Sequence, residues 1–208
     1  MMNGNRSEFI RHISECLGRR KVPAAPSALA RSNEVQHEFL NGASAEELEE
    51  VFIRNAKAAG TAVYQCPLSS LPGTILIAIP QLAAGPILLT ADPFWEAQHI
   101  VAALHTIERN VQVWDPAETR ERNIGCAEGA AVGMAVAELG LAETGTAMIY
   151  SHQGCGRSVT LLPTTTLFII RRESIRPRLT QAMAYLKQQK EAGLPSAIHF
   201  ISAASSTA

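Results

Sequence analysis

The sequence predicts a layered α/β domain with a largely parallel sheet, preceded by a helical arm. Short apolar runs of strand length alternate along the chain with segments of helical period. That alternation is typical of βαβ units, in which helices connect parallel strands. The chain has 208 residues, enough to bury one full hydrophobic core.

The first element is an amphipathic helix over residues 6–17, where Phe9, Ile10 and Ile13 share one stripe and Gly18 is a stop signal. Residues 19–32 are rich in proline, alanine and serine and predict an extended linker. We therefore expect residues 1–33 to form an arm that docks on the body or on a neighbouring subunit, and residues 34–208 to form the main domain.

The main domain opens with a helix signal. Ser44 and Glu47 have the spacing of a capping box, and Gly60 is placed to end the helix that follows. Residues 62–68 then predict a short strand, and a second helix is expected from Asp92-Pro93 to about Arg109.

Strands and helices continue to alternate in the second half. The pair at 132–150 is interpreted as two buried strands, either parallel members of the sheet or an antiparallel excursion within it. The other predicted elements are strands at 111–114, 167–171 and 197–202 and helices at 117–130 and 174–190.

Composition excludes several classes of function. A formal net charge of −1 gives no general attraction to nucleic acid or to anionic membranes. The four cysteines form no C-x-x-C pair, and the six histidines have no metal-ligand spacing, so no metal site is predicted. Neither a signal peptide nor a membrane span is recognisable, and the expected location is the cytoplasm.

Glu143 is the first candidate for a catalytic residue. It lies between Ala142 and Thr144-Gly145 in an apolar stretch, and a partly desolvated carboxylate there is suited to proton transfer or to attack on a carbonyl. Alternatively, Glu143 accepts hydrogen bonds from backbone amides and fixes a loop. Glu138 could lie beside it as a second carboxylate, or form a structural ion pair with Arg157 or Arg171.

A glycine loop is the second candidate feature. Gly154 and Gly156, like Gly145, permit close approach of backbone amides to an anion, and Arg157 offers a bidentate fork for carboxylate or phosphate. The alternative is a structural turn. His152 is either an acid–base group or an exposed loop residue. The hydroxyl side chains that could complete the ligand site are Thr144, Thr146 and Ser158.

The same residues carry a family resemblance. The segments AELGLAETGT (137–146), GRSVTLLP (156–163) and TLFIIRR (166–172) resemble the LUD domain of the lactate-utilisation protein C family. The resemblance is specific over residues 111–208 and looser before them. It implies a three-layer α/β/α, Rossmann-like fold of the type found in CoA transferases and sugar-phosphate isomerases, with ligands at the ends of strands.

The resemblance also implies a pathway. The protein would be a component of a bacterial system that oxidises L-lactate to pyruvate, acting with two partner proteins that carry the iron–sulfur clusters of electron transfer. This chain would hold no cofactor and would bind an organic acid or another small anion. Whether it is itself an enzyme stays open.

Two alternatives remain beside this reading. One is a stand-alone, CoA-transferase-like enzyme that handles acyl groups or sugar phosphates through Glu143. The other is a non-catalytic regulatory or scaffold protein. Where the family has a Gly-Pro pair and a further strand, this chain has Ala203-Ala204 and ends at residue 208. The expectation is a truncated copy or an incomplete chain, whose unpaired sheet edge would favour association into a homo-oligomer.

Overall fold

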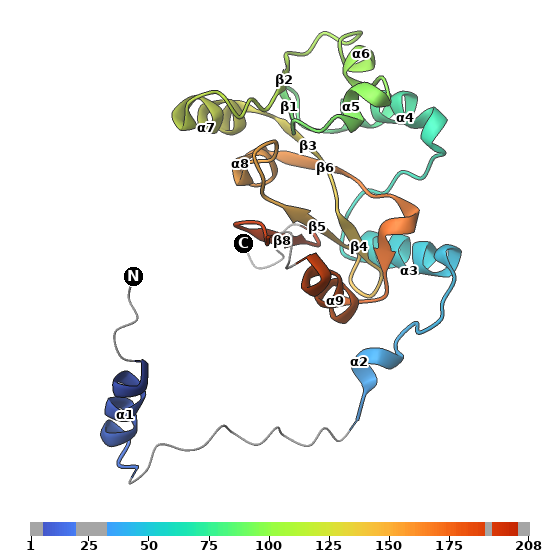
Figure 1. The fold of residues 1–208 in the computed structure, drawn as a ribbon. Coiled ribbons are helices and arrows are strands. Elements are labelled where there is room, and N and C mark those ends of the chain that lie inside the picture. The colour runs from blue at the N-terminus through green and yellow to red at the C-terminus, as the bar shows by residue number, and fades with distance from the viewer. Residues whose placement is uncertain (1–5, 20–32, 190–192, 204–208) are drawn as a thin grey trace. The chain divides into compact units, whose positions relative to one another are not determined.

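A computed structural model describes residues 6–19, 33–189 and 193–203, and the chain divides into two units, Met1–Glu34 and Val35–Ala208 (Figure 1). The first unit contains α1 (Arg6–Cys16), in which Arg11 lies 3.9 Å from both Glu8 and Glu15. Gly18 follows with a φ of +67°, which confirms the predicted helix stop. Residues 20–32 of the predicted linker lie outside the described residues, and docking of the arm stays a prediction.

The second unit begins with α2 (Val35–Glu38) and α3 (Ala45–Ala58). The predicted capping box is confirmed, because Ser44 Oγ accepts from the Glu47 amide at 3.2 Å and Glu47 Oε2 accepts from the Ser44 amide at 2.8 Å. Gly60, with a φ of +86°, follows the last turn of α3.

Four parallel strands form the first sheet, sheet A. Its spatial order is β2-β1-β3-β6, so the first strand in sequence lies in the interior of the sheet. The strands are β1 (Ile87–Leu89), β2 (Val111–Val113), β3 (Val132–Val136) and β6 (Thr165–Ile169).

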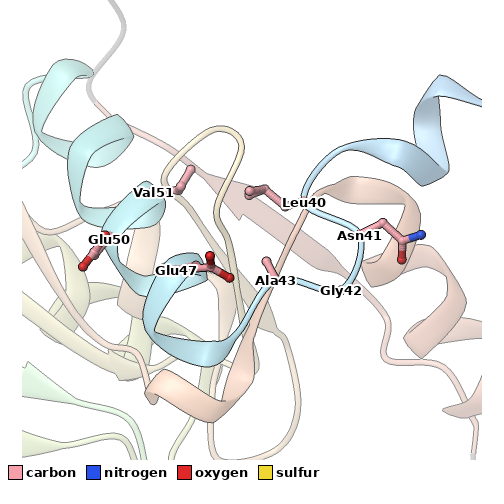
Figure 2. A pocket seen from close by; sticks show the side chains of 7 residues that line it. All are labelled: Leu40, Asn41, Gly42, Ala43, Glu47, Glu50 and Val51. Carbon is pink, nitrogen blue, oxygen red and sulfur yellow. The ribbon is translucent and has the colours of Figure 1, made fainter.

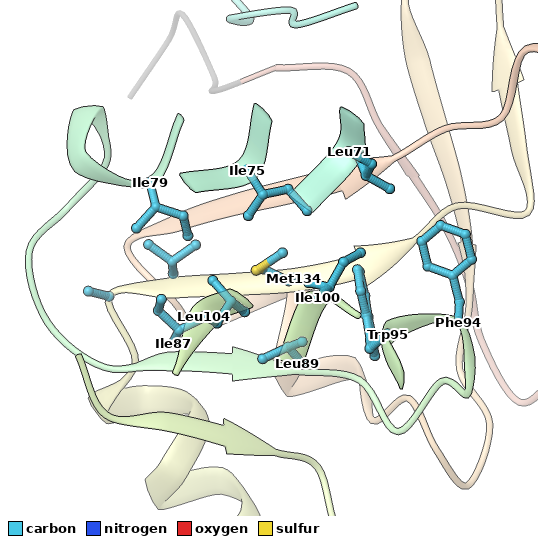
Figure 3. Close-up of a cluster of buried hydrophobic side chains, with 12 residues drawn as sticks. Leu71, Ile75, Ile79, Ile87, Leu89, Phe94, Trp95, Ile100, Leu104 and Met134 are labelled. Atoms are coloured by element: carbon cyan, nitrogen blue, oxygen red, sulfur yellow. The ribbon is translucent and has the colours of Figure 1, made fainter. Parts of the chain in front are cut away.

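One face of sheet A is covered by helices that carry the largest core cluster (Figures 1 and 3). Ile87 and Leu89 of β1 point into this cluster, together with Met134 of β3. The covering elements are α4 (Leu71–Ala78), η2 (Ile79–Gln81), α5 (Phe94–Ala97) and α6 (Ile100–Leu104), and η1 (Leu68–Ser70) leads into α4.

The opposite face packs on α7 (Arg120–Gly129) and α8 (Arg157–Leu161). Leu88 of β1 meets Ala127 and Val159 there. Gly133 of β3 has no side chain because a Cβ would lie 2.2 Å from the Val159 carbonyl oxygen, so α8 approaches the strand backbone directly. Helices on both faces of a parallel sheet make three layers, and the predicted α/β/α fold is confirmed.

A second, mostly antiparallel sheet, sheet B, has the order β7-β4-β5-β8. Only the β4–β7 pair is parallel. One cluster of sheet B side chains, including Leu139 and Met148, packs on α9. A second cluster includes Ile149 of sheet B and Phe168 of sheet A. The elements are β4 (Leu139–Leu141), β5 (Thr146–Tyr150), η3 (Arg172–Ser174), β7 (Ile175–Arg176), α9 (Leu179–Gln189) and β8 (Ile198–Ile201).

The strand prediction at 62–68 is wrong. These residues have no hydrogen-bonded partner strand, and they lead into η1. Their apolar side chains belong to two different cores: Val63 packs beside Phe52, whereas Cys66 packs on the core cluster that contains the buried residues of α4. The alternation that suggested a strand therefore reflects an extended connection between two cores.

The single helix predicted from 93 to 109 is also wrong. It is interrupted at His99, which adopts a left-handed φ of +56°, and the second piece ends at Leu104. The break lets Trp95 and Ile100, from two short helices, enter the same core cluster.

The helix predicted at 174–190 begins only at Leu179, because Pro177 disfavours helical backbone in the preceding residue. Ile175 belongs to β7 instead. The inward residues of α9 are Ala182 and Leu186, whereas Leu179 and Met183 are exposed. The pair predicted at 132–150 divides between the sheets: β3 is parallel in sheet A, and the antiparallel pair is β4 with β5.

Across the described ranges, no helix combines the length and the apolar character that a membrane crossing requires.

Candidate functional site

The carboxyl ends of the sheet A strands bring together side chains that are far apart in the sequence. The order β2-β1-β3-β6 places a topological switch point between β1 and β3, because α5 and α6 follow β1 on one face and α8 covers the other. Ligands of open parallel sheets bind in this position. Asp92 follows β1, Glu138 follows β3 and Arg171 follows β6. We call this region the switch-point edge.

The loop that carries His152 is fastened over the switch-point edge. The Ala91 amide donates to the Gly154 carbonyl at 2.7 Å, and Trp114 Nε1 donates to the Gln153 carbonyl at 2.8 Å. Within the loop, the His152 and Cys155 backbones exchange two hydrogen bonds of 3.0 Å. The Gly154 amide donates to His152 Nδ1 at 3.1 Å, so the neutral ring carries its proton on the exposed Nε2 side.

Glu138 is the electrostatic centre of the switch-point edge. The carboxyl is half-buried, and this burial raises its pKa above the ordinary value. The negative charge of Asp92 raises the pKa further, whereas the positive charges of His152 and Arg171 lower it. Three charged groups, each placed after a different strand, therefore act on one carboxyl. A carboxyl with a raised pKa can exchange a proton nearer to neutral pH than an ordinary glutamate can.

Arg171 supplies the positive charge of the switch-point edge. Its guanidinium carbon lies 5.3 Å from the centre of the Phe94 ring, a cation–π contact. Phe94 is positioned in turn by Asp92, whose Oδ1 accepts from the Phe94 amide at 2.8 Å. Within the described residues, the exposed Arg171 side chain makes no ion pair and no hydrogen bond. Its donors are therefore available to an anion.

Tyr150, at the end of β5, adds a buried phenol. Burial raises its pKa to about 12, and the neighbouring Tyr185 and Glu138 act in the same direction. The phenol is therefore a proton donor at neutral pH. Its Oη is buried beside Tyr185, which contributes to the raised pKa but does not meet Oη with the distance and angle of a good hydrogen bond. A polar atom left in that condition is costly, and a ligand group could satisfy it.

Glu143, the sequence-predicted catalytic residue, lies in the turn between β4 and β5. Its Oε1 is 2.9 Å from Arg178 Nη2, and its amide donates to the Pro177 carbonyl at 2.9 Å. Asn55 of α3 donates to the carbonyls of Ala142 and Glu143 at 2.8 and 3.0 Å. These contacts tie the turn to α3 and to the start of α9, and they use an ion pair with Arg178 where the structural alternative expected hydrogen bonds from backbone amides. The catalytic role of Glu143 stays a prediction.

Gly145, in the same turn, has a φ of +62°, and a Cβ on it would lie 2.4 Å from the Ala56 amide nitrogen. The glycine is needed for close packing on α3. Thr144 and Thr146 place their hydroxyls 2.6 Å apart, and Thr146 Oγ1 is 2.8 Å from Ser202 Oγ. The three hydroxyls form a chain that joins the turn to the residue after β8.

The structure places the predicted site residues at two ends of the β4–β5 hairpin. Glu143, Thr144, Gly145 and Thr146 lie at the turn, whereas Glu138 and His152 lie at the open end, beside sheet A. An extended run of five residues, as from Glu138 to Glu143, spans about 17 Å. The two carboxylates are therefore not neighbours, and Glu138 belongs with the glycine loop.

The glycine loop itself packs on protein atoms. A Cβ on Gly154 would lie 2.8 Å from the Ala91 carbonyl oxygen, and one on Gly156 would lie 2.2 Å from the Trp114 ring. Arg157 is exposed, and Ser158 follows it in the first turn of α8. Their role in binding an anion stays a prediction.

Cys155 is buried in the loop and belongs electrostatically to the same cluster. Burial raises the pKa of its thiol to about 11, with Asp92 and Glu138 contributing. Such a thiol is a poor nucleophile at neutral pH. No group of three or more His, Cys, Asp or Glu side chains suited to a metal ion occurs among the described residues.

A separate surface hollow lies between the loop after α2 and the first turns of α3 (Figure 2). Its lining contains Glu47 and Glu50 and no cationic side chain, so it repels rather than attracts an organic acid. The residues that line it are Leu40, Asn41, Gly42, Ala43, Glu47, Glu50 and Val51.

The sequence-based site omitted Asp92, Tyr150 and Arg171. One signal could have found Asp92 and Arg171: each directly follows an apolar run of strand length, and the carboxyl ends of parallel strands meet at one edge. The strand order, which decides that these ends are adjacent, is not visible in local periodicity.

Comparison with known proteins gives a consistent family. The family model described as the LUD domain matches residues 49–208. A protein of Geobacillus kaustophilus named lactate utilization protein C is 32% identical, with coverage of 98% of this chain and 87% of that protein. The uncharacterized protein YkgG of Escherichia coli is 36% identical, with coverage of 98% and 89%.

The fold also has a match among solved structures. A crystal structure of a DUF162 family protein from Deinococcus radiodurans superposes with a TM-score of 0.59 at 19% identity, covering 76% of this chain and 88% of that one. At this identity the likeness concerns the fold alone.

Proposed function

Because the chain belongs to the LUD-domain family, we propose that it acts in lactate utilisation, as one component of a system that oxidises L-lactate to pyruvate. Relatives about one-third identical over nearly the whole chain carry the name lactate utilization protein C, which supports this role. The proposal includes a cytoplasmic location and leaves the number of subunits to experiment.

The ligand site of this proposal is the switch-point edge, and its ligand is a small organic acid. The observation that carries it is Arg171, a guanidinium held over the Phe94 ring with its hydrogen-bond donors unused by the described residues. A guanidinium fork matches the two oxygens of a carboxylate. His152 Nε2 and the Tyr150 phenol are further donors around the same edge.

In this proposal, the electrons removed from L-lactate are not accepted by a group on this chain. Oxidation of L-lactate to pyruvate removes two electrons and two protons, and we assign the electrons to two partner proteins with iron–sulfur clusters. This chain binds and orients the acid and exchanges protons. The resemblance to the lactate-utilisation protein C family supports that division of labour.

A stand-alone CoA-transferase-like reaction is the competing function, and it requires Glu143 as an acyl acceptor. The ion pair between Glu143 and Arg178 speaks against it, because the carboxylate would have to leave its guanidinium before attacking a carbonyl. A purely regulatory or scaffold role would need neither Glu143 nor Arg171.

Growth on L-lactate as sole carbon source tests the proposal. A strain that lacks this gene is complemented with the wild type, Arg171→Gln, Glu143→Gln or Arg54→Gln, the last a control for an exposed arginine on α3 with no partner among the described residues. We expect growth with the wild type and Arg54→Gln and loss of growth with Arg171→Gln at equal protein level. Normal growth of the deletion strain would overturn the pathway assignment.

The two substituted site candidates separate the competing functions. Loss of growth with folded Glu143→Gln, together with growth of Arg171→Gln, would favour the Glu143 enzyme. Growth with both variants would favour the scaffold role.

A further inference from the structure

The switch-point edge holds more negative charge than an anion site should. Asp92 and Glu138 both lie there as carboxyls, and Arg171 is their cationic neighbour. A carboxylate ligand that binds Arg171 therefore meets two negative charges at close quarters. Repulsion between like charges in a partly buried site weakens binding unless one of them is neutralised.

Asp92 is unsuited to take up the neutralising proton. Its Oδ1 already accepts a hydrogen bond from the Phe94 amide at 2.8 Å, so this carboxyl has a structural partner at the start of α5. The Glu138 carboxyl, by contrast, makes no hydrogen bond and no ion pair with the described residues, so a proton on it breaks none of their contacts.

We propose, resting on the ligand site proposed above, that binding of a small carboxylate to Arg171 is coupled to uptake of one proton by Glu138. Without ligand, Arg171 and His152 favour the ionised form of Glu138, and Asp92 and burial oppose it. A carboxylate bound to Arg171 neutralises the positive charge that favours ionised Glu138, and it adds a negative charge beside Glu138. Both changes drive a proton from solvent onto Glu138, so the site binds an anion and a proton together.

The surroundings of Glu138 support this coupling from every packed element. Asp92 approaches after β1, Arg171 after β6, and His152 and Cys155 from the loop after β5. Tyr150, with Tyr185 of α9 behind it, stays protonated at neutral pH. The Cys155 thiol is likewise neutral there. His152 is exposed, and its Nδ1 accepts from the Gly154 amide within the loop.

The protonated carboxyl has a further use. Glu138 as an acid is a hydrogen-bond donor, and with His152 Nε2 it can bind an oxygen on the carbon next to the ligand carboxylate. The ligand class that fits is a short 2-hydroxy or 2-oxo acid, which presents a carboxylate to Arg171 and a second oxygen to the proton donors.

Calorimetric titration of the full chain tests the coupling. L-Lactate, pyruvate and acetate are titrated between pH 5 and 8.5, in buffers with different ionisation enthalpies, and neutral lactamide serves as the control ligand. We expect uptake of up to one proton per carboxylate bound at pH values above the raised pKa of free Glu138, and an affinity that falls as pH rises through that range, by at most tenfold per pH unit. Lactamide should bind weakly and without that proton uptake.

Variants identify the group that takes up the proton. Glu138→Gln imitates the protonated acid, so it should retain binding and lose most of the pH dependence, while Arg171→Gln should lose carboxylate binding. Glu128→Gln, an exposed position on α7, is the matched control and should behave as the wild type. His152→Asn should keep the proton uptake, which separates Glu138 from the nearby imidazole.

Three results would overturn the inference: binding of carboxylates without proton uptake, a wild-type pH profile in Glu138→Gln, or no binding of any of the three acids by the folded protein. The pathway is judged separately by growth. Proton-coupled binding in a protein whose deletion leaves growth on L-lactate intact would retain this inference and remove the lactate assignment.

Discussion

The Glu143 carboxylate and the Arg178 guanidinium form an ion pair in which Oε1 lies 2.9 Å from Nη2. Arg178 also donates to the Val35 carbonyl at 3.1 Å and lies 5.9 Å from the centre of the Phe39 ring. One arginine thus joins the β4–β5 turn, the start of α9 and the segment around α2. The polar cluster at this turn therefore has a structural use that needs no ligand.

Glu143→Gln should accordingly lower stability and leave ligand binding at the switch-point edge unchanged. Both side chains of the ion pair are partly exposed, so we expect a loss of about 1 kcal/mol in the free energy of unfolding, measured by urea denaturation. A double-mutant cycle with Arg178→Met isolates the pair. A stable Glu143→Gln protein that fails to support growth on L-lactate would instead identify Glu143 as a functional residue.

Gly145→Ala should be strongly destabilising. The new methyl group would lie 2.4 Å from the Ala56 amide nitrogen, at a φ of +62° that L-residues seldom adopt. Together these effects cost about 3 kcal/mol, measured by chemical denaturation. Gly125→Ala, in the middle of α7 with open space around its Cα, is the control and should stabilise by roughly 0.5–1 kcal/mol. Equal stability of the two variants would contradict the packing of the turn on α3.

The thiols should differ in reactivity by orders of magnitude. Cys16 is exposed, whereas Cys155 is buried with a pKa of about 11, so fewer than about one in a thousand Cys155 side chains is a thiolate at pH 7.5. Labelling with a disulfide reagent should modify Cys16 first and Cys155 last, and Cys155→Ala should remove the slowest phase. Labelling of Cys155 as fast as Cys16 would mean that the 152–156 loop opens readily.

Glu138→Gln should change the pH dependence of stability. The pKa of Glu138 is raised in the folded protein, chiefly by burial, so ionisation of this group favours the unfolded chain. Below the ordinary value of 4.5 the carboxyl is protonated in both states, and the wild type and the variant should be similar. As pH rises through the raised pKa, the wild type should lose stability relative to Glu138→Gln.

Thermal unfolding from pH 4 to pH 8 measures this difference. The stability difference should be modest, because the Glu138 carboxyl is half exposed and solvent screens its interactions with neighbouring charges. A wild-type protein that gains stability over the variant with rising pH would show that Arg171 and His152 outweigh the burial of Glu138.

Local features of the fold were predictable from the sequence. The Ser44–Glu47 capping box depends on residues three apart, and the helix stop at Gly18 depends on a single backbone conformation. The buried strand at 132–136 appears as an apolar run whose side chains meet helices on both faces of sheet A. For such features the physical cause lies within a few residues of the signal.

Sequence-based prediction failed for two segments, and the physical reason differs between them. Residues 62–68 alternate because Val63 and Cys66 reach different clusters, and residues 93–109 break at His99 so that two short helices fill one cluster. Periodicity records which side chains are buried, but it does not record which core receives them.

The sequence by itself determined the α/β class, the family and the presence of Glu138 and His152 among the candidate residues. Only the tertiary structure decided that these two lie with Asp92 and Arg171, while Glu143 lies at the far end of the hairpin with Arg178. The physical reason is strand order. Parallel pairing of β1 with β3 and of β3 with β6 brings together chain segments dozens of residues apart, and such pairing depends on burial across the whole core rather than on any local pattern.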